Sequence, residues 1–478
     1  MDYAKLGLKA GLEIHQQLDT GKLFCACPSY LRSEEPHFVV RRKLHAVAGE
    51  EGEIDAAVQH EAALGRTFEY QGYHDTTCLV ELDEEPPHFI NEEALDVALM
   101  IALLLQCEVY LVTQVMRKTV IDGSNTSGFQ RTVLLAHDGF VETSFGKVKI
   151  DTLCLEEDAA RLIGKDGKSA TYRLDRLGIP LVEIATAAVL DTPEKIKETA
   201  LKLGEILRAC KVKRGIGTIR QDVNVSIRGH ERVEIKGFQE PSMMVETVKK
   251  EIERQQRGLK EGKKQGEVRN ALPSGETEFL RPLPGRARMY PETDLPLLRI
   301  RREQLNELKK KLPKLRHEIR DELKKKGLSE ELTSLVLDGH VEEFEVLMRV
   351  YDTHANLVAK MIALWRREFA AKLKKSFEEV EEKLSERVLE EVLEAVREGK
   401  LQEGEVKPVL WKIVSEGKSV EQALKIERVD DSALEEQIAA IVAQKPGLRI
   451  NAYMGMVIAK IPDVDKRKAM EILQKITK

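Results

Sequence analysis

Two patterns of apolar and polar residues follow one another along the chain. Up to about residue 300, short runs rich in β-branched residues lie between glycines, at 148–155, 178–186, 217–227 and 232–238. Such runs predict strands. Two helices are predicted among them, one with Asn91 as its N-cap and one with Thr192 as its N-cap and Pro193 at the first helical position. The first part of the chain is therefore predicted to mix sheet and helix.

From about Arg301 the pattern changes to that of helices. Segments rich in Glu, Lys and Leu place apolar residues three and four positions apart, as at 378–400. Gly327 followed by Ser329 marks one helix boundary, a softer one falls at 404–408, and the polar stretch 254–276 is predicted to be an exposed connection. We therefore predict an α+β fold. A mainly antiparallel-sheet domain at 1–300 is followed by all-helical domains at 301–408 and 409–478.

Composition and charge limit the class of protein. With 478 residues, 42% of them hydrophobic, and a formal charge of −5, the chain can form several cores, and any nucleic-acid affinity must come from local basic patches. The start has no signal-peptide pattern, and the longest apolar run, Val97 to Leu105, is too short to cross a bilayer. The six cysteines lie far apart except for Cys25 and Cys27, which favours reduced thiols. We predict a cytoplasmic protein without membrane association.

Acidic residues and one histidine recur in the predicted strands. An unpaired carboxylate on a buried strand costs several kcal/mol unless a cation compensates it. Oxygen ligands with a single imidazole suit magnesium or manganese, which in turn suggests the handling of phosphate groups. A strand also has a solvent face, and any one of these residues alone is more often a surface residue than a ligand, so the set matters more than its members. The set is Glu13, His15, Glu156 to Asp158, Glu183, Asp222 and Glu234.

Two further motifs allow more than one interpretation. The loop from Asp122 to Gln130 could present backbone N–H groups to phosphates, or it could simply be a good turn. Cys25 and Cys27 could suggest zinc, but a structural zinc site normally needs four ligands and no second closely spaced pair of cysteines follows. We therefore predict buried thiols and no zinc.

Several segments, in order, resemble one known family. They are GLEIHQQLDTGKLFC (11–25), VIDGSNTSGFQRT (120–132), CLEEDAARL (154–162), LDRLGIPLVEIAT (174–186), TIRQDVNVSI (218–227), VEIKGFQ (233–239), RPLPGRARMYPETDLP (281–296) and NAYMGMVIAK (451–460). The chain resembles the GatB/GatE proteins of tRNA-dependent amidotransferases over nearly its whole length, and its DGSNTSGFQRT and TTCLVELDEEPPH segments are more similar to archaeal GatE than to bacterial GatB. The resemblance implies a cradle domain, a helical domain and a helical tail similar to YqeY proteins.

The resemblance also implies an activity. The chain would belong to an ATP-dependent carbon–nitrogen ligase that phosphorylates the γ-carboxylate of the glutamate on Glu-tRNA(Gln), after which ammonia from glutamine displaces phosphate to give Gln-tRNA(Gln). Phosphoryl transfer of this kind needs charge neutralisation and alignment more than a protein nucleophile. The sequence has no amidase or asparaginase signature. A second chain must therefore release the ammonia. The resemblance to GatE implies that this partner is an asparaginase-like glutaminase subunit, GatD, in a hetero-tetramer with two copies of each subunit.

Site residues follow from matching the family's motifs. The resemblance implies that His15, Glu157 and Glu183 hold the catalytic magnesium, with manganese possible and with Glu157 chosen over Glu156. Glu13, Asp222 and Glu234 would lie near a second metal or the ammonia entrance, and Lys236 would guide ammonia or orient a carboxylate. Within the loop from Asp122 to Gln130, the residues that could contact ATP are Ser124, Asn125, Thr126 and Ser127. Because guanidinium groups match phosphate oxygens, the candidates to contact ATP or the acceptor end of the tRNA are Arg173, Arg176, Arg220 and Arg288.

One departure from the family leaves alternatives open. Archaeal GatE has an insertion, similar to a domain of bacterial aspartyl-tRNA synthetase, between the VEIKGFQ and RPLPG segments, and only about forty residues separate these segments here. The missing piece is thought to contact tRNA. The chain could therefore be a non-catalytic tRNA-binding scaffold, or a GatB-like enzyme that also acts on Asp-tRNA(Asn). Basic positions at 309–326 and the tail segment 451–460 are further candidates for contact with RNA.

Overall fold

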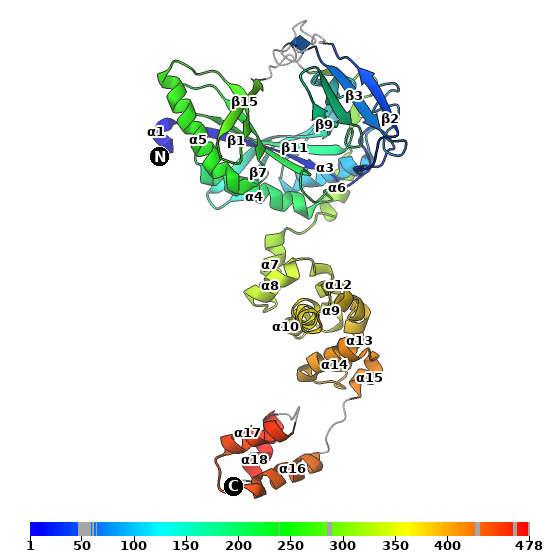
Figure 1. Ribbon diagram of the computed structural model, residues 1–478, viewed down its shortest axis with the longest axis vertical. Helices are drawn as coiled ribbons and strands as arrows, with labels where there is room; N and C mark the ends of the chain where they lie inside the picture. Colours follow the sequence, from blue (N-terminus) through cyan, green and yellow to red (C-terminus); the bar gives the residue numbers. More distant parts are fainter. Residues whose placement is uncertain are drawn as a thin grey trace. The chain divides into compact units, whose positions relative to one another are not determined.

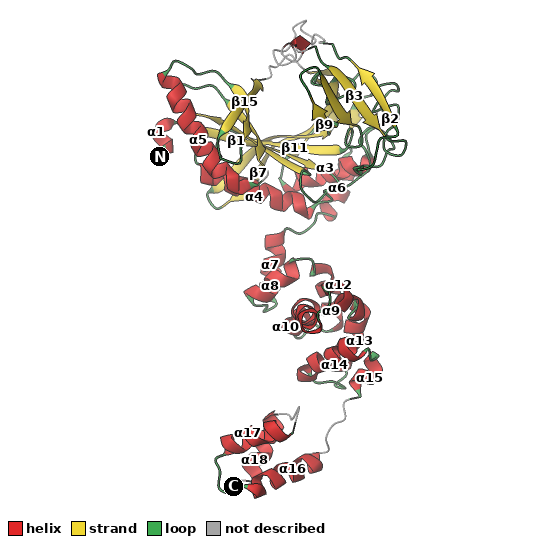
Figure 2. Cartoon of the chain, in the orientation of Figure 1, coloured by secondary structure: helices red, strands yellow, loops and turns green. Residues whose placement is uncertain are grey.

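The computed structural model describes residues 1–45, 59, 62–63, 65–238, 240–283, 289–425, 431–461 and 466–476 (Figure 1). The chain divides into two compact units, Met1–Arg316 and His317–Lys478. All the described strands lie in the first unit, and the second unit is helical (Figure 2). The predicted α+β class is confirmed.

A large sheet dominates the first unit. Its strands are β1 (Lys9–Gln17), β4 (Glu108–Val109), β6 (Val115–Thr119), β7 (Phe129–Thr143), β8 (Gly146–Glu157), β11 (Pro180–Thr186), β12 (Ile219–Ser226), β13 (Val233–Phe238), β14 (Glu267–Ala271), β15 (Thr277–Pro282) and β16 (Met289–Pro291). The order is β15-β14-β13-β12-β1-β11-β8-β7-β6-β16, with β4 paired to β7. Every described pairing in it is antiparallel except that of β13 with β14. The prediction of a mainly antiparallel sheet is therefore confirmed.

Two smaller sheets and a set of helices complete the first unit. A four-stranded sheet has the order β2 (Phe38–Arg42), β3 (Thr67–Gly72), β10 (Ser169–Arg173) and β9 (Arg161–Lys165), and β5 (Val112–Thr113) pairs with β17 (Leu298–Arg299). The helices are α1 (Tyr3–Leu6), α3 (Glu92–Leu104), α4 (Pro193–Ala209), α5 (Pro241–Lys260) and α6 (Arg302–Lys310). The stretch 254–276, predicted to be a connection, instead contains the end of α5, which contacts β12 and β13, and all of β14, which pairs with β13 and β15.

Helices α3, α4 and α5 pack on one face of the large sheet. Both predicted caps are present: Asn91 accepts a hydrogen bond from the Ala94 N–H at 2.9 Å, and Thr192 accepts one from Lys195 at 3.3 Å. The helices share a core with alternate strand residues, such as Leu12 and Ile14 of β1. Because side chains alternate along a strand, the residues between them face the opposite side of the sheet.

The second unit consists of α7 (Arg316–Lys325), which begins at the boundary, α8 (Glu330–Leu337), α9 (Val341–Val350), α10 (Ala355–Ala359), a π-helix η1 (Lys360–Trp365), α11 (Arg366–Leu373), α12 (Phe377–Lys383), α13 (Glu386–Arg397), α14 (Glu403–Glu416), α15 (Val420–Leu424), α16 (Asp431–Gln444), α17 (Ile450–Lys460) and α18 (Lys466–Ile476). Residues of α7 to α15 form one apolar core, and residues of α16 to α18 form another. The predicted boundary at 408 falls within α14, and the three predicted domains stay a prediction.

Among the described residues, none of the helices has the length and apolar character needed to span a bilayer.

A buried ion pair in the second unit gives a prediction about stability. Arg366 is 1% exposed, bonds both carboxylate oxygens of Glu343 at 2.6 and 2.7 Å, and donates to the Leu384 carbonyl. Because removing one partner of a buried pair leaves the other charge uncompensated, we expect Arg366→Met to destabilise the unit by about 3 kcal/mol.

The chain offers a matched control and a selective probe. The side chain of Arg387 is 87% exposed beside Glu391, so Arg387→Met should cost less than about 1 kcal/mol. The two tryptophans, Trp365 and Trp411, both lie in the second unit, so tryptophan fluorescence during urea unfolding reports on it. Equal unfolding midpoints for the two variants would contradict the prediction.

Candidate active site

A cavity of about 1000 Å³ lies on the face of the large sheet that the helices leave free. Strand alternation explains why its lining is charged. In β11, Val182 and Ile184 belong to the apolar core, while Glu183 between them lines the cavity. The same alternation places Glu13, His15, Asp222, Glu234 and Lys236 in the cavity.

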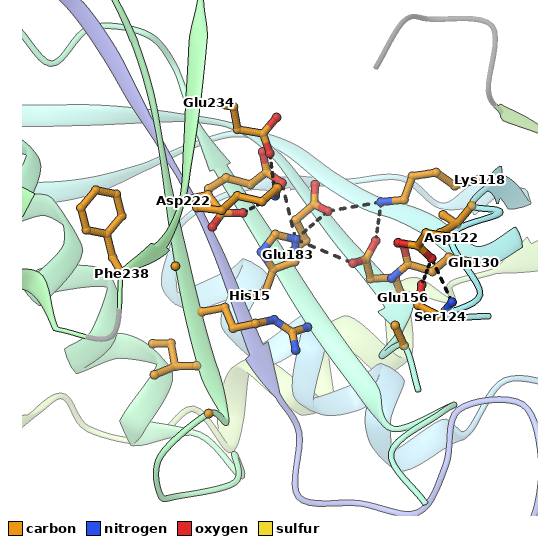
Figure 3. A pocket seen from close by; sticks show the side chains of 18 of the residues that line it. His15, Lys118, Asp122, Ser124, Gln130, Glu156, Glu183, Asp222, Glu234 and Phe238 are labelled. Carbon is orange, nitrogen blue, oxygen red and sulfur yellow. Dashed lines mark hydrogen bonds and ion pairs between the residues drawn. The ribbon is translucent and has the colours of Figure 1, made fainter. Parts of the chain in front are cut away.

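The register of three neighbouring strands brings the predicted residues together. Strand β1 lies between β11 and β12, so His15 is paired with Glu183 on one side and with Arg220 on the other. One alternation earlier in β1, Glu13 is paired with Asp222. Residues far apart in the sequence thus meet at the centre of the sheet (Figure 3).

His15 is surrounded by carboxylates. Its Nε2 atom lies 3.2 Å from Glu183 Oε2, 3.5 Å from Glu13 Oε1 and 3.8 Å from Glu156 Oε1. Burial lowers the pKa of His15, but the hydrogen bond and charge of Glu183, with the charges of Glu156 and Glu13, outweigh it and raise the pKa to about 9. Burial and the nearby charge of Glu183 raise the pKa of Glu13 to about 7. The cluster therefore has an excess of negative charge that a divalent cation would compensate.

Two lysines hold the outer carboxylates. Lys118 Nζ lies 2.9 Å from Glu156 Oε2 and 3.6 Å from Glu183 Oε2. Lys236 Nζ lies 2.6 Å from Asp222 Oδ2 and 2.6 Å from Glu234 Oε1. In the second group of predicted ligands, Lys236 therefore already compensates the charges of Asp222 and Glu234.

The choice between Glu156 and Glu157 is corrected by the structure. Glu156 is on the cavity face of β8, where the Thr132 hydroxyl also donates to it at 2.6 Å. Glu157 is on the other face, where its Oε2 accepts from the Arg131 N–H at 3.3 Å and lies 3.5 Å from Arg131 Nη1. Burial raises the pKa of Glu157 against the opposing effect of Arg131. The structure thus places Glu156, and not the predicted Glu157, beside His15 and Glu183.

The predicted phosphate loop is divided between two cavities. Ser124 and Asn125 line the large cavity, and the buried Asn125 Nδ2 has no hydrogen-bond partner among the described residues. Thr126 and Ser127 line a separate, much smaller cavity, and their hydroxyls donate to the carbonyls of Glu81 and Phe129. Only the first two residues of the predicted set are therefore placed to meet a ligand in the large cavity.

Most of the predicted arginines already have partners. Arg220 lines the cavity but bonds Asp158 at 2.8 Å. Arg176 donates to the carbonyls of Ala159 and Ala160 at 2.8 and 2.9 Å, and Arg173 donates to Gln71 at 3.0 Å. Arg288 lies outside the described residues.

The cavity is also lined by three cationic residues that were not predicted from the sequence: Lys118, Arg232 and Arg281. The position of Arg232 could have been predicted, because it precedes Glu234 by two residues and alternation puts both side chains on one face of the strand. Arg281 comes to the cavity only through the pairing of β14 with β13 and β15, which the sequence alone did not indicate.

The fold brings Cys78 and Glu81 to Cys25 and Cys27, with one ligand atom from each within 4.8 Å of the others. Counting closely spaced cysteines could not reveal this group, because about fifty residues separate its halves. The buried Lys22 Nζ lies 2.9 Å from Glu81 Oε1 and compensates that carboxylate. The absence of zinc stays a prediction, but a shortage of nearby ligands no longer supports it.

Comparison with known proteins identifies the relatives of this chain. The family described as the GatB/GatE catalytic domain matches residues 8–306, and the GatB domain family matches residues 342–454. A protein of Methanocaldococcus jannaschii, named as the E subunit of glutamyl-tRNA(Gln) amidotransferase, is 36% identical, over 99% of each chain. A protein of the same name from Methanothermobacter thermautotrophicus is 38% identical over 77% of this chain and 81% of its own length. One from Pyrobaculum neutrophilum is 51% identical over 53% of this chain and 42% of its own.

The catalytic-domain match covers every charged residue around His15, and the similarity to the Methanocaldococcus protein extends over nearly all of both chains. Together with the α+β architecture and the carboxylate-lined cavity, these matches show that the chain belongs to the GatB/GatE family.

Proposed function

We propose that this chain is the carboxylate-activating subunit of a Glu-tRNA(Gln) amidotransferase. ATP phosphorylates the γ-carboxylate of glutamate on the tRNA, and ammonia then displaces phosphate to give the amide. The observation that supports this most is the set of His15, Glu156 and Glu183 in a large cavity. The name of the relatives, which are glutamyl-tRNA(Gln) amidotransferase proteins, supports the substrate.

His15, Glu156 and Glu183 would hold the magnesium, with manganese as an alternative. Their donor set fits the ion, because one imidazole and several carboxylate oxygens lie close together with surplus negative charge. When bound, the ion supplies charge neutralisation for phosphoryl oxygens and holds them in line with the acceptor. Lys118, at 2.9 Å from Glu156, keeps that carboxylate turned toward His15.

Glu13 is suited to the second step. When ammonia attacks the acyl phosphate, the C–N bond forms, the C–O bond to phosphate breaks, and the nitrogen must lose a proton. Glu13 lines the cavity 3.5 Å from His15 Nε2, and in the chain without metal burial and Glu183 raise its pKa to about 7, so we propose Glu13 as the group that accepts this proton. Lys236 holds Asp222 and Glu234 beside it, each at 2.6 Å.

Ammonia must come from another protein, because the sequence has no amidase or asparaginase signature. We propose an asparaginase-like glutaminase subunit, GatD, in a hetero-tetramer with two copies of each subunit, and glutamine as the amido donor. The naming of the relatives as one subunit of an amidotransferase supports an assembly of several subunits.

The chain is shorter than the protein of Methanocaldococcus, and residues on both sides of the predicted deletion line the cavity. The alignment with the Methanocaldococcus protein runs over 628 positions, against 478 residues here, so many positions of that protein have no counterpart. Between α5 and β14 the chain makes a closed turn, in which the Lys263 N–H donates to the Gly258 carbonyl at 2.8 Å. The turn is also bonded to the segment before β13, because the Glu231 N–H donates to the Lys264 carbonyl at 2.9 Å. We infer that the cavity acts without an inserted domain, since Glu240 and Arg281 on either side of this region both line it.

Proton release on metal binding gives a prediction that depends on pH. His15 must be neutral to bind an ion, yet its pKa without metal is raised to about 9, so metal binding at pH 7 releases its proton. We expect the apparent affinity for Mn²⁺ to rise about tenfold between pH 7 and pH 8 and about fivefold between pH 8 and pH 9, where His15 approaches its pKa. Titration followed by electron paramagnetic resonance measures it.

The His15→Asn variant is the control for this titration, because its amide does not titrate. Its weaker affinity should change little over the same range. Equal Mn²⁺ affinity of the unmodified chain at pH 7 and pH 8 would show that His15 does not bind the ion as a neutral ligand. The proposed activity itself is tested by phosphate release from ATP with charged RNA compared with uncharged RNA.

A further inference from the structure

Two arginines in the cavity differ from its other cationic residues. Lys118, Lys236 and Arg220 each have a carboxylate partner. Arg232 and Arg281 also line the cavity, but among the described residues neither side chain has a hydrogen bond or an ion pair. Two guanidinium groups without a bonded partner are suited to bind an anion that enters the cavity.

The sheet places the two arginines together. Arg232 directly precedes β13 and shares one face of the chain with Glu234, two residues later. Across β14, Glu234 is paired with Val268 and Val268 with Arg281, so Arg281 lies in the same row. Both arginines are near enough to Glu234 to help lower its pKa against burial, but Lys236 contributes more and bonds this carboxylate at 2.6 Å. The carboxylate therefore leaves the hydrogen-bond donors of the arginines available.

The position of the pair indicates the kind of anion. Arg232 is exposed, and Arg281 lies on β15, the last strand at this edge of the sheet. Arginines at an exposed sheet edge are typical of grooves that bind single-stranded nucleic acid, because guanidinium groups contact successive phosphates of the backbone.

We propose that Arg232 and Arg281 bind the phosphodiester backbone of the unpaired acceptor end of the RNA. This inference rests on the proposed function and adds a binding site to it. The phosphates of ATP have the same chemistry and are the other possible source. The exposed edge favours RNA, because ATP must reach the carboxylates around His15 at the centre of the sheet.

The test uses the full chain and two forms of one tRNA, intact and without its unpaired 3′ nucleotides. We expect Arg232→Ala and Arg281→Ala each to weaken binding of intact tRNA about tenfold, as for loss of a charged hydrogen bond. Each change should also reduce the slope of log affinity against log salt concentration by about one, because one fewer counterion is released on binding. The tRNA without its unpaired 3′ nucleotides should bind with the same affinity to the unmodified chain and to the double variant, in which Arg232 and Arg281 are both replaced by alanine.

Matched controls separate this inference from the proposed function. Arg257→Ala removes the same charge from an exposed position on α5 that does not line the cavity, and tRNA affinity should not change. Equal binding of intact tRNA by the double variant and the unmodified chain would overturn the inference. Weaker ATP binding with unchanged tRNA binding would also overturn it and assign the arginines to the nucleotide. If the unmodified chain binds no tRNA, the proposed function itself fails.

Discussion

Replacement of His15 by alanine is expected to lower ATP turnover with charged RNA about 100-fold or more. His15 Nε2 lies within 3.8 Å of oxygens of Glu13, Glu156 and Glu183, so its loss removes the one imidazole from the proposed metal site. Changes that only disturb the surroundings of metal ligands already cost about 10- to 100-fold, and loss of a ligand should cost at least the upper value.

The variant needs a control for folding and one for histidine chemistry in general. His88 is exposed, pairs with Glu85 at 3.3 Å and does not line the cavity, so His88→Ala should keep full turnover. Mn²⁺ binding should be lost in His15→Ala and kept in His88→Ala, and far-UV circular dichroism should show that both variants are folded at the assay temperature. Normal turnover in His15→Ala would exclude this histidine from the site.

Glu156→Gln and Glu157→Gln form the second decisive pair. Both changes remove one charge and keep the size of the side chain. Glu156 faces His15, so Glu156→Gln should lower Mn²⁺ affinity and turnover about 100-fold. Glu157 faces Arg131 on the other side of β8, so Glu157→Gln should retain metal binding.

The two variants are compared by Mn²⁺ titration and by single-turnover phosphate release. Arg131 keeps its bond to Glu292, at 2.9 Å, when Glu157 loses its charge, so the fold should tolerate that change. Loss of metal binding in Glu157→Gln with normal binding in Glu156→Gln would restore the assignment made from the sequence motif.

The local elements of the fold were predictable from particular residues. Asn91 and Thr192 cap helices where the sequence indicated, because a side-chain oxygen before an apolar helical pattern satisfies free N–H groups. Strand runs such as 178–186 were also visible from their composition. The order of the strands was not, because β1 lies between β11 and β12, and such long-range pairing is specified by packing rather than by local pattern.

Most residues of the candidate site could be predicted from the sequence, but their arrangement could not. His15, Glu13, Glu183 and Asp222 meet as expected, although only the register shows which of them are neighbours. The sequence already indicated which face of β8 each glutamate occupies. Leu153 and Leu155 face the core, so by alternation Glu157 lies on their face of the strand and Glu156 on the opposite face.

Which arginines have ion-pair partners could not have been predicted from the sequence. Arg220 and Arg281 are chemically alike in the sequence, yet one bonds Asp158 at 2.8 Å and the other has no hydrogen bond or ion pair among the described residues. The difference depends on which side chains the folded strands bring together. For the same reason, the group formed by Cys25, Cys27, Cys78 and Glu81 was not foreseen.

The most direct test of the proposed function is phosphate release from ATP by the full chain, mixed with an asparaginase-like glutaminase, magnesium and glutamine. Charged Glu-tRNA(Gln) is compared with the same tRNA uncharged and with Asp-tRNA(Asn). Phosphate and Gln-tRNA(Gln) are expected to appear together, only with Glu-tRNA(Gln), and both are expected to be lost in Glu156→Gln. Binding of the charged tRNA without any phosphate release would contradict the proposed function and indicate a non-catalytic scaffold.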